Sequence, residues 1–390
     1  MHRQIYLDNS ATTRICDEAL AKYNEISLSY FGNPSSLHKM GFDAEKLLSA
    51  ARSEILSSLG AVGSSVIFTA SGSEANNLAI IGRALAKERY RRGAKIITTE
   101  GEHASVYSPL DRLSEMGYKV VRIPTREGKI DLDALWREMT ADVILVTMML
   151  VNNETGALYD IPSVVKIAKK QSPEAIIHID ATQGYMKVPI IKSRMGVDMI
   201  TVSSHKIEGP KGIGALVVDE RVLKSRGLSP IVFGGGQELG LRSGTENVPA
   251  ACAFGEAVKI GRAEFAKRRE KLEALRSYLI EKLDTSEELS EISYINPESH
   301  APHILNITLP KIKSETMLHY LSSLGIYVSS GSACSSNSTA VSSALLSYGK
   351  TAAEADASLR ISFSWRNEFD EVDELVSALA SGLSKLSRIR

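Results

Sequence analysis

The feature that most constrains the fold of this chain is an alternation of short apolar runs with helical segments. The runs SVIFTAS (65–71), AKIITTE (94–100) and DVILVTMML (142–150) contain many β-branched residues and are typical of buried strands. The segments 73–93 and 108–117 carry apolar residues at helical spacing and end at a glycine. Because parallel strands need crossover helices between them, this order predicts an α/β fold with a mainly parallel sheet covered by helices on both faces.

The pattern changes after about residue 255. Segment 254–283 has the spacing of one long amphipathic helix, and beyond it strand-like runs alternate with further helices. We therefore predict two domains joined at the long helix. The large domain spans 16–255, and a smaller α+β domain is formed by 1–15 and 256–390.

Composition excludes several function classes. Lys plus Arg and Asp plus Glu both number 46, so no basic excess favours direct binding to nucleic acid. No apolar run is long enough to cross a bilayer. The three cysteines (Cys16, Cys252 and Cys334) are far apart, which argues against a disulfide framework and favours a reducing cytoplasm. We expect a cytoplasmic protein without a membrane partner.

A lysine follows one of the predicted strands. In SSHKIEGPKG (203–212), Lys206 stands between His205 and a glycine-rich turn. A lone lysine in a turn is usually a surface residue. However, ligands collect at strand ends in α/β sheets, and a partly desolvated lysine there can form a Schiff base. Ser203 and His205 could donate hydrogen bonds to a phosphate.

Two other predicted strand ends carry residues suited to a cofactor. Gly72 lets the backbone approach a ligand closely, and Ser73 opens a helix whose N-terminus could bind an anion. Ser73 could instead be only the N-cap of that helix. Asp180 ends another strand and is either a turn residue or a carboxylate that keeps a pyridine nitrogen protonated.

Two further polar residues allow both a cofactor role and a structural one. His103 could stack on a flat ring or be a structural hydrogen-bonding residue, and Asn153 could orient a phenolic oxygen or cap a turn. A reactive lysine, a phosphate cradle, a carboxylate for a ring nitrogen and a stacking histidine together fit pyridoxal 5'-phosphate better than another cofactor. We predict no metal site.

A lone thiol lies in the serine-rich run SSGSACSSNSTAVSS (329–343). Serine and glycine have little apolar surface to bury, so this run cannot build a core. Cys334 is therefore either a functional thiol on a flexible tether, which lets it reach two different places, or a free thiol without function. Cys16 and Cys252 lie in mixed apolar contexts and are predicted to be packing residues.

The sequence resembles the cysteine desulfurases of the NifS/IscS type, which belong to the fold-type I, class V aminotransferase-like enzymes that use pyridoxal phosphate. The resemblance spans nearly the whole chain, with the motifs in the family's order. It implies a large domain with a mainly parallel seven-stranded sheet between helices, plus a smaller α+β domain. The matching stretches are YLDNSATT, GNPSSLH, SGSEANN, EHAS, VNNETG, HIDATQG, SSHKIEGPKGIGAL, RSGTEN, SSGSACSS and LRISFS.

The resemblance also implies how the cofactor ring is held. Lys206 would carry the cofactor as a Schiff base, and Asp180 would pair with the pyridine nitrogen. Gln183 would contact the phenolic oxygen. His103 would stack on the ring and take part in proton transfer, and Asn153 would touch the cofactor or the substrate carboxylate.

The phosphate would be held by Ser73, Ser203 and His205, beside Gly72. Thr245 in RSGTEN would reach the phosphate of the neighbouring subunit, which implies a homodimer with shared active sites. The phosphate turn reads SGSE where many relatives have GATE or GGTE, and its serine keeps the hydroxyl.

The remaining roles concern substrate and sulfur. Arg360 would bind the carboxylate of L-cysteine with Asn33 nearby, and Cys334 would accept the sulfur as a persulfide, leaving L-alanine. The sulfur would pass to an iron–sulfur scaffold protein or to an acceptor for tRNA or cofactor thiolation. Glu208 stands where relatives often carry an aromatic residue or histidine, and we expect its carboxylate near the cofactor.

Two other interpretations remain open. The chain could be a pyridoxal phosphate aminotransferase or a selenocysteine lyase, which would make no persulfide on Cys334. It could also be a sulfur carrier or interaction protein that catalyses nothing and has a vestigial cofactor site. The presence of Lys206, Asp180 and Cys334 favours the desulfurase.

Overall fold

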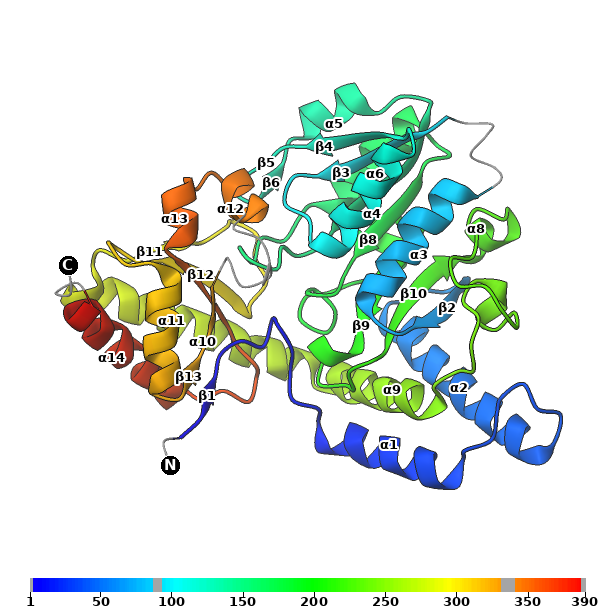
Figure 1. The fold of residues 1–390 in the computed structure, drawn as a ribbon, viewed down its shortest axis with the longest axis horizontal. Coiled ribbons are helices and arrows are strands. Elements are labelled where there is room, and N and C mark those ends of the chain that lie inside the picture. The colour runs from blue at the N-terminus through cyan, green and yellow to red at the C-terminus, as the bar shows by residue number, and fades with distance from the viewer. Residues whose placement is uncertain (1–2, 87–92, 331–340, 387–390) are drawn as a thin grey trace.

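The computed structural model describes residues 3–86, 93–330 and 341–386, so Cys334 lies outside the described residues. The chain forms a larger α/β part and a smaller part beside it, with the N-terminal strand packed against the smaller one (Figure 1). The predicted α/β class is therefore confirmed.

A seven-stranded sheet forms the centre of the larger part, in the strand order β2-β10-β9-β8-β7-β3-β4. Strand β10 runs antiparallel to both of its neighbours, and the other adjacent pairs are parallel, so the predicted mainly parallel sheet is confirmed. In spatial order the strands are β2 (Ser64–Thr69), β10 (Gly214–Asp219), β9 (Met199–Ser203), β8 (Ile176–Asp180), β7 (Val143–Met149), β3 (Lys95–Thr99) and β4 (Lys119–Ile123).

Both faces of this sheet are buried. Successive residues of one strand point to opposite faces, and in β2 they join two different apolar clusters. In β2, Val66 and Phe68 join one apolar cluster and Ile67 joins another. Three helices contribute to the Ile67 side: α3 (Gly72–Leu85), α4 (Ala104–Glu115) and α8 (Glu220–Lys224). Five contribute to the opposite side: α1 (Asp17–Ser29), α2 (Lys39–Ser58), α5 (Leu132–Glu138), α6 (Ile161–Gln171) and α9 (Val248–Ala263), and α1 packs on α9.

The smaller part is built on a four-stranded antiparallel sheet with a core of its own. Ile5 and Leu7 from the N-terminus belong to this core, together with Leu279 and Leu305. Its strands are β11 (Ser293–Ile295), β12 (Ile304–Thr308), β15 (Ser358–Ser362) and β14 (Ser329–Ser330), and β1 (Ile5–Tyr6) pairs in parallel with β13 (Ile326–Tyr327) nearby. Its helices are α10 (Phe265–Thr285), α11 (Ser314–Ser323), α12 (Ser343–Tyr348), α13 (Ala352–Asp356) and α14 (Phe369–Leu386). The predicted domain limits at residues 15 and 255 stay a prediction.

Short elements complete the described chain. They are β5 (Thr125–Arg126), β6 (Lys129–Ile130), α7 (Lys192–Met195), α8 (Glu220–Lys224) and three 3-10 turns, η2 (Ser204–Lys206), η3 (Glu238–Gly240) and η4 (Glu287–Leu289). Within the described ranges, no helix combines the length and the apolar character that a membrane crossing needs.

Two helix predictions were wrong in extent. The predicted helix over 254–283 is two helices, α9 and α10, which meet at Glu264 with φ −103° and ψ 8°. The break lets α9 pack into the larger core while the leucines of α10 pack into the smaller one. The helix predicted over 73–93 is α3, which ends at Leu85, because Ala86 has an extended backbone (φ −61°, ψ 139°).

Candidate active site

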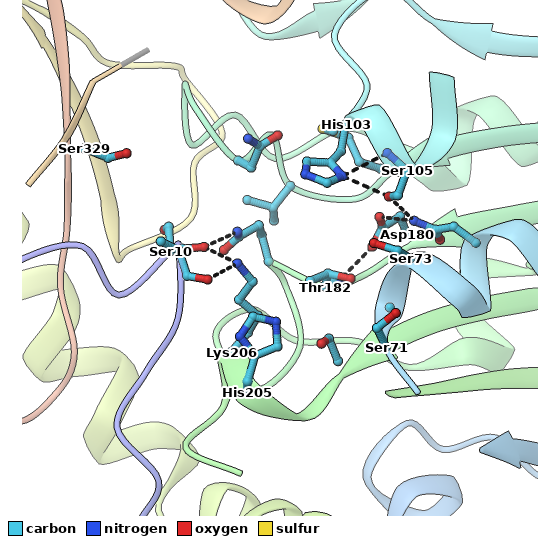
Figure 2. Close-up of a pocket in the computed structure, with 18 of the residues that line it drawn as sticks. Ser10, Ser71, Ser73, His103, Ser105, Asp180, Thr182, His205, Lys206 and Ser329 are labelled. Atoms are coloured by element: carbon cyan, nitrogen blue, oxygen red, sulfur yellow. Dashed lines mark hydrogen bonds between the residues drawn. The ribbon is translucent and has the colours of Figure 1, made fainter. Parts of the chain in front are cut away.

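A cavity of about 410 Å³ opens where the two parts meet, at the carboxyl ends of the parallel strands (Figure 2). Asp180 and Ser203 line it from the ends of β8 and β9. Arg360 and Ser329 line it from the smaller part, and Ser10 lines it from the N-terminal segment. The cavity therefore depends on three segments that lie far apart in the sequence.

Lys206 ends the short turn η2 that follows β9. Its amine donates hydrogen bonds to the carbonyl oxygens of Ser10 and Ala11, the latter at 2.7 Å. Figure 2 shows the Lys206 side chain directed toward this N-terminal segment across the edge of the cavity. The predicted position of Lys206 at a strand end beside a cavity matches the geometry.

Asp180 is buried at the end of β8, with an exposed fraction of 7%. Its carboxylate accepts hydrogen bonds from Asn76 Nδ2 at 2.7 Å and from the backbone N–H of Thr182 at 2.9 Å. Both donors are neutral, and among the described residues Asp180 forms no ion pair. A buried carboxylate without a cationic partner is suited to a protonated group on a ligand.

His103 is both a structural hydrogen-bonding residue and a cavity residue. It is the N-cap of α4, where Nδ1 accepts the backbone N–H of Ser105 at 3.1 Å. Burial lowers the pKa of His103, while the charge of Asp180 opposes this shift. The ring is therefore neutral near pH 7, with its proton on Nε2 in the tautomer that the cap requires.

The N-terminus of α3 forms a cradle at the cavity. Helix α3 begins at Gly72, and Ser71 is its N-cap because its hydroxyl accepts the N–H of Glu74 at 3.1 Å. Ser73 lines the cavity but is the second helical residue, so the interpretation of Ser73 as the N-cap was wrong. A Cβ added at Gly72 would lie 3.3 Å from Cβ of Ser203.

The hydroxyl of Ser203 is buried and has no hydrogen-bond partner among the described residues. Buried hydroxyls nearly always have a partner, so an unpartnered one beside a helix N-terminus indicates a place for an acceptor ligand. The Gly72–Ser203 edge is therefore suited to an anion such as a phosphate.

Gln183 and His205 hold the N-terminal segment at the cavity. Gln183 Nε2 donates to the carbonyl of Ser10 at 2.9 Å, and its Oε1 lies 3.4 Å from Nε2 of His303. His205 Nδ1 lies 3.1 Å from the hydroxyl of Thr12. Burial, followed by the charge of Lys206, lowers the pKa of His205 to about 4, so this ring is neutral at physiological pH.

Arg360 lines the cavity from β15 and ties the two parts together. Its Nη1 donates to the backbone carbonyl of Asn153 at 3.0 Å, and its Nη2 pairs with Asp8 at 2.9 Å. Its Nε is buried and has no partner among the described residues. One donor of this guanidinium therefore remains for a ligand.

Two of the predicted site residues within the described ranges do not line this cavity of the same chain. Asn33 and Thr245 lie on exposed loops, where the Oδ1 of Asn33 accepts the backbone N–H of Ser35 at 2.9 Å. Cys334 lies outside the described residues. The roles of these three residues stay predictions.

Glu208 corrects one expectation. Its carboxylate does not line the cofactor-sized cavity, because it is directed into the junction between the two parts, where it is 5% exposed. It accepts from Arg268 at 3.1 Å, from Trp365 at 3.1 Å and from Arg366 at 2.9 Å. These three donors come from the smaller part and hold the carboxylate away from the cavity.

The sequence interpretation missed several lining residues, which are Ser10, Ser71, Asn76, Ser105 and Thr182. Asn76 lies within the motif SGSEANN, but its contact with Asp180 could be found only from the packing of α3 on the sheet. Cys16 and Cys252 are buried, and burial raises the pKa of the Cys252 thiol to about 11, which disfavours a reactive thiolate. The described residues hold no cluster of three or more metal-ligating side chains.

The family model described as Aminotransferase class-V matches residues 5–375. The chain belongs to this family. It is 35% identical to the protein named cysteine desulfurase IscS 1 of Archaeoglobus fulgidus, over 98% of this chain and 97% of that protein. Together with the likeness to solved NifS-like proteins, this places it in the NifS/IscS group.

Two solved structures support the same family at the level of the fold. A NifS-like protein superposes with a TM-score of 0.90 at 32% identity, covering 98% of this chain and all of that one (100%). SspA, solved in complex with cysteine, has a TM-score of 0.78 at 31% identity, covering 92% of this chain and 99% of that one.

Enzymes of this family depend on pyridoxal 5'-phosphate, and the cavity of this chain fits that group. A lysine amine, a buried carboxylate without a cationic partner, an unpartnered serine hydroxyl and a glycine at a helix N-terminus lie around one cavity. These are the groups needed for an aldehyde, a ring nitrogen and a phosphate. The fit therefore rests on the Ser203 hydroxyl, which has no partner among the described residues, and on the lysine and the carboxylate that line the same cavity.

Proposed function

We propose that this chain is a cysteine desulfurase that removes sulfur from L-cysteine with pyridoxal phosphate as its cofactor. The observation that carries the proposal is the placement of the Lys206 amine and the Asp180 carboxylate in one cavity with the N-terminus of α3. The solved relative SspA binds cysteine, which supports cysteine as the substrate.

The cavity residues would hold the cofactor as follows. Lys206 would bind it through Nζ, Asp180 would keep a proton on its ring nitrogen, and Gln183 would contact its phenolic oxygen. His103 would lie against the ring, and Asn153 would contact the cofactor or the substrate. The phosphate would be held beside Gly72 by Ser73, Ser203 and His205, and by Thr245 of a second copy in a homodimer.

When bound, pyridoxal phosphate supplies an electron sink for the carbon from which a proton is removed. Arg360 would bind the carboxylate of the substrate, with Asn33 nearby, and so orient its Cα. Nζ of Lys206 would take the proton from Cα as general base and return a proton to the product. Neutral His103 would take part in this proton transfer.

The sulfur step would use Cys334 as nucleophile. Its thiolate attacks the sulfur of the bound cysteine, the Cβ–S bond of the substrate breaks, and an S–S bond forms on Cys334. The substrate carbon that loses sulfur gains a hydrogen, so one cysteine and one thiol give one alanine and one persulfide. We propose that the terminal sulfur then passes to an iron–sulfur scaffold protein or a thiolation acceptor in the cytoplasm.

The experiment incubates the purified, pyridoxal phosphate-loaded protein with L-cysteine and measures alanine, sulfide and, by mass spectrometry, added sulfur on Cys334. Cys334→Ser should keep the visible absorbance of the bound cofactor and lower alanine formation at least about 100-fold. Lys206→Ala should lose both the visible absorbance of the bound cofactor and alanine formation. Cys252→Ser is the control, because Cys252 is buried away from the cavity and should leave turnover unchanged.

Three outcomes would contradict the proposal. Unchanged alanine formation in Cys334→Ser would favour a selenocysteine lyase or another activity without a persulfide. Transfer of the amino group to an added keto acid would indicate an aminotransferase. Absence of cofactor absorbance in the unchanged protein would favour the interpretation without catalysis.

A further inference from the structure

A second lysine contacts the backbone of Lys206. Lys187 is 8% exposed and sits in the turn that follows β8. Its Nζ donates a hydrogen bond of 2.9 Å to the backbone carbonyl of Lys206. Lys187 does not line the large cavity, but it lines a small one of about 30 Å³ together with Lys206 and Glu208.

The turn that carries Lys206 needs donors from outside. A short 3-10 turn leaves its last carbonyls without partners inside the turn. The carbonyl of His205 accepts the N–H of Thr13 at 2.9 Å and its hydroxyl at 2.8 Å. The carbonyl of Lys206 accepts Nζ of Lys187. Thus the two successive peptides that place the reactive amine are each anchored by a different segment.

A lysine is a costly residue for this anchoring role. A buried ammonium is unfavourable unless a carboxylate neutralises it, and within the described residues Lys187 forms no ion pair. The carboxylate that lines the same small cavity, Glu208, already binds Arg268 and Arg366. Burial, followed by the charge of Lys206, lowers the pKa of Lys187 to about 7, while Glu208 opposes the shift.

We propose that Lys187 is a positioning residue for Lys206, which it serves in two ways. Its amine fixes the Lys206 peptide from outside the large cavity, and in its protonated form it disfavours a second positive charge on the Lys206 side chain. The charge effect follows because Coulomb repulsion between two lysines acts on both. This inference rests on the proposed role of Lys206 as the residue that binds the cofactor.

Five other ionisable groups surround Lys187 or feel its charge, which are Lys206, Glu208, Arg268, His205 and His303. Burial lowers the pKa of His303 well below its ordinary value, and the charge of Lys187 adds to this shift. Since Glu208 and Arg268 are paired with each other, their charges largely cancel.

The test compares Lys187→Met with the unchanged protein, both loaded with pyridoxal phosphate. The first readout is the pH midpoint of the visible absorbance of the cofactor bound at Lys206. Loss of the neighbouring positive charge should raise this midpoint by about 0.5 to 1 pH unit. The second readout is turnover, where kcat should fall about tenfold with KM within about twofold, because a misplaced amine slows chemistry more than binding.

Lys211→Met is the matched control, because Lys211 lies on the same loop as Lys206 but is exposed. It should leave both the midpoint and kcat unchanged. Lys187→Arg, which keeps a positive donor, should return the midpoint toward that of the unchanged protein. If Lys187→Met does not fold, Lys187→Gln takes its place, with the same upward shift expected from the lost charge.

An unchanged absorbance midpoint in the neutral variant, with only a lower melting temperature, would overturn the inference. This result is distinct from failure of the proposed function, which would appear as missing cofactor absorbance or missing alanine formation in the unchanged protein. A midpoint shift of equal size in Lys211→Met would also contradict a specific role for Lys187.

Discussion

At the scale of single residues, the best guide to the site is a buried polar atom that the chain itself does not satisfy. The hydroxyl of Ser203 and Nε of Arg360 are buried and lack partners among the described residues. Native proteins rarely bury such atoms without a partner, so both positions indicate where a ligand contributes the missing acceptor. The two atoms belong to different parts of the molecule, and in our proposal Ser203 would bind a phosphate and Arg360 a carboxylate.

Gly72→Ala tests the phosphate cradle. The added Cβ would lie 3.2 Å from the hydroxyl of Thr182 and 3.3 Å from Cβ of Ser203, so it would crowd the N-terminus of α3. We expect affinity for pyridoxal phosphate to fall at least about tenfold. The melting temperature of the cofactor-free protein should not fall, because alanine is favoured over glycine in helices by about 1 kcal/mol. Equilibrium titration of the apoprotein measures the first effect.

Gly255→Ala provides the control for this prediction. A Cβ at Gly255 would meet Ala51 in α2 at 3.1 Å to Cα, which is equally tight, but far from the cavity lining. This variant should keep its cofactor affinity, because Gly255 does not line the cavity. Wild-type affinity in Gly72→Ala would show that the phosphate is bound elsewhere.

At the scale of elements, the sequence predicted the order of strands and helices, because β-branched runs and helical spacing are local signals. Residues at strand ends, such as Lys206 and Asp180, could be assigned for the same reason. The break at Glu264 could not, because helical spacing continues through it and only the packing of two separate cores requires it. Ser71 and Ser73 are both suitable N-caps, so the sequence could not decide at which of the two serines helix α3 begins.

The direction of Glu208 could not be predicted either. The groups that hold its carboxylate, Arg268, Trp365 and Arg366, lie 60 to 158 residues further along the chain. The residue also has a left-handed backbone (φ 65°), which turns the chain just after Lys206. The sequence of the segment around Glu208 contains no information on any of these three partners.

Glu208→Gln tests whether this contact joins the two parts. Removing the charge leaves Arg268, whose side chain is 10% exposed, with one of its two carboxylate partners, the half-exposed Glu264. Breaking a fully buried pair costs about 3–5 kcal/mol, and since Arg268 keeps Glu264 and Arg366 is half-exposed we expect a smaller loss of about 1–2 kcal/mol in the free energy of unfolding. Denaturant unfolding of the cofactor-free protein measures it.

Glu298→Gln is the matched control, because Glu298 pairs with Lys129 across two segments but both side chains are exposed. Its free energy of unfolding should equal that of the unchanged protein within experimental error, because exposed ion pairs contribute little to stability. If both variants lose the same small amount, Glu208 does not fasten the junction.

At the scale of the whole molecule, the cavity exists only while the two parts stay together. The N-terminal segment crosses between them. Ile5 and Leu7 pack in the smaller core, and the backbone carbonyls of Ser10 and Ala11 accept hydrogen bonds from the amine of Lys206. Arg360 makes a second connection through Asp8 and Asn153. Any change that destabilises either core should therefore weaken cofactor binding as well.

The sheet itself makes stability sensitive to acid. His178 lies in the centre of the sheet, fully buried, with Nδ1 2.8 Å from the hydroxyl of Thr147 on β7 and Nε2 2.9 Å from that of Thr201 on β9. Burial lowers its pKa from 6.5 to about 4, although Asp180 opposes the shift. His205 and His303 are shifted in the same direction.

We expect the free energy of unfolding to be highest above pH 6.5 and to fall as the pH drops toward 4. In that window the unfolded chain binds protons that the folded chain does not, so acid favours unfolding. The shift of His178 alone accounts for a loss of about 2 kcal/mol between pH 7 and pH 5. In His178→Gln, stability at pH 7 should be lower, because glutamine fits the two threonines less well, yet its fall between pH 7 and pH 5 should be smaller by about that amount. Replacing the exposed His319 by Gln should leave the fall unchanged, and equal falls in His178→Gln and the unchanged protein would show that His178 is charged in the folded sheet.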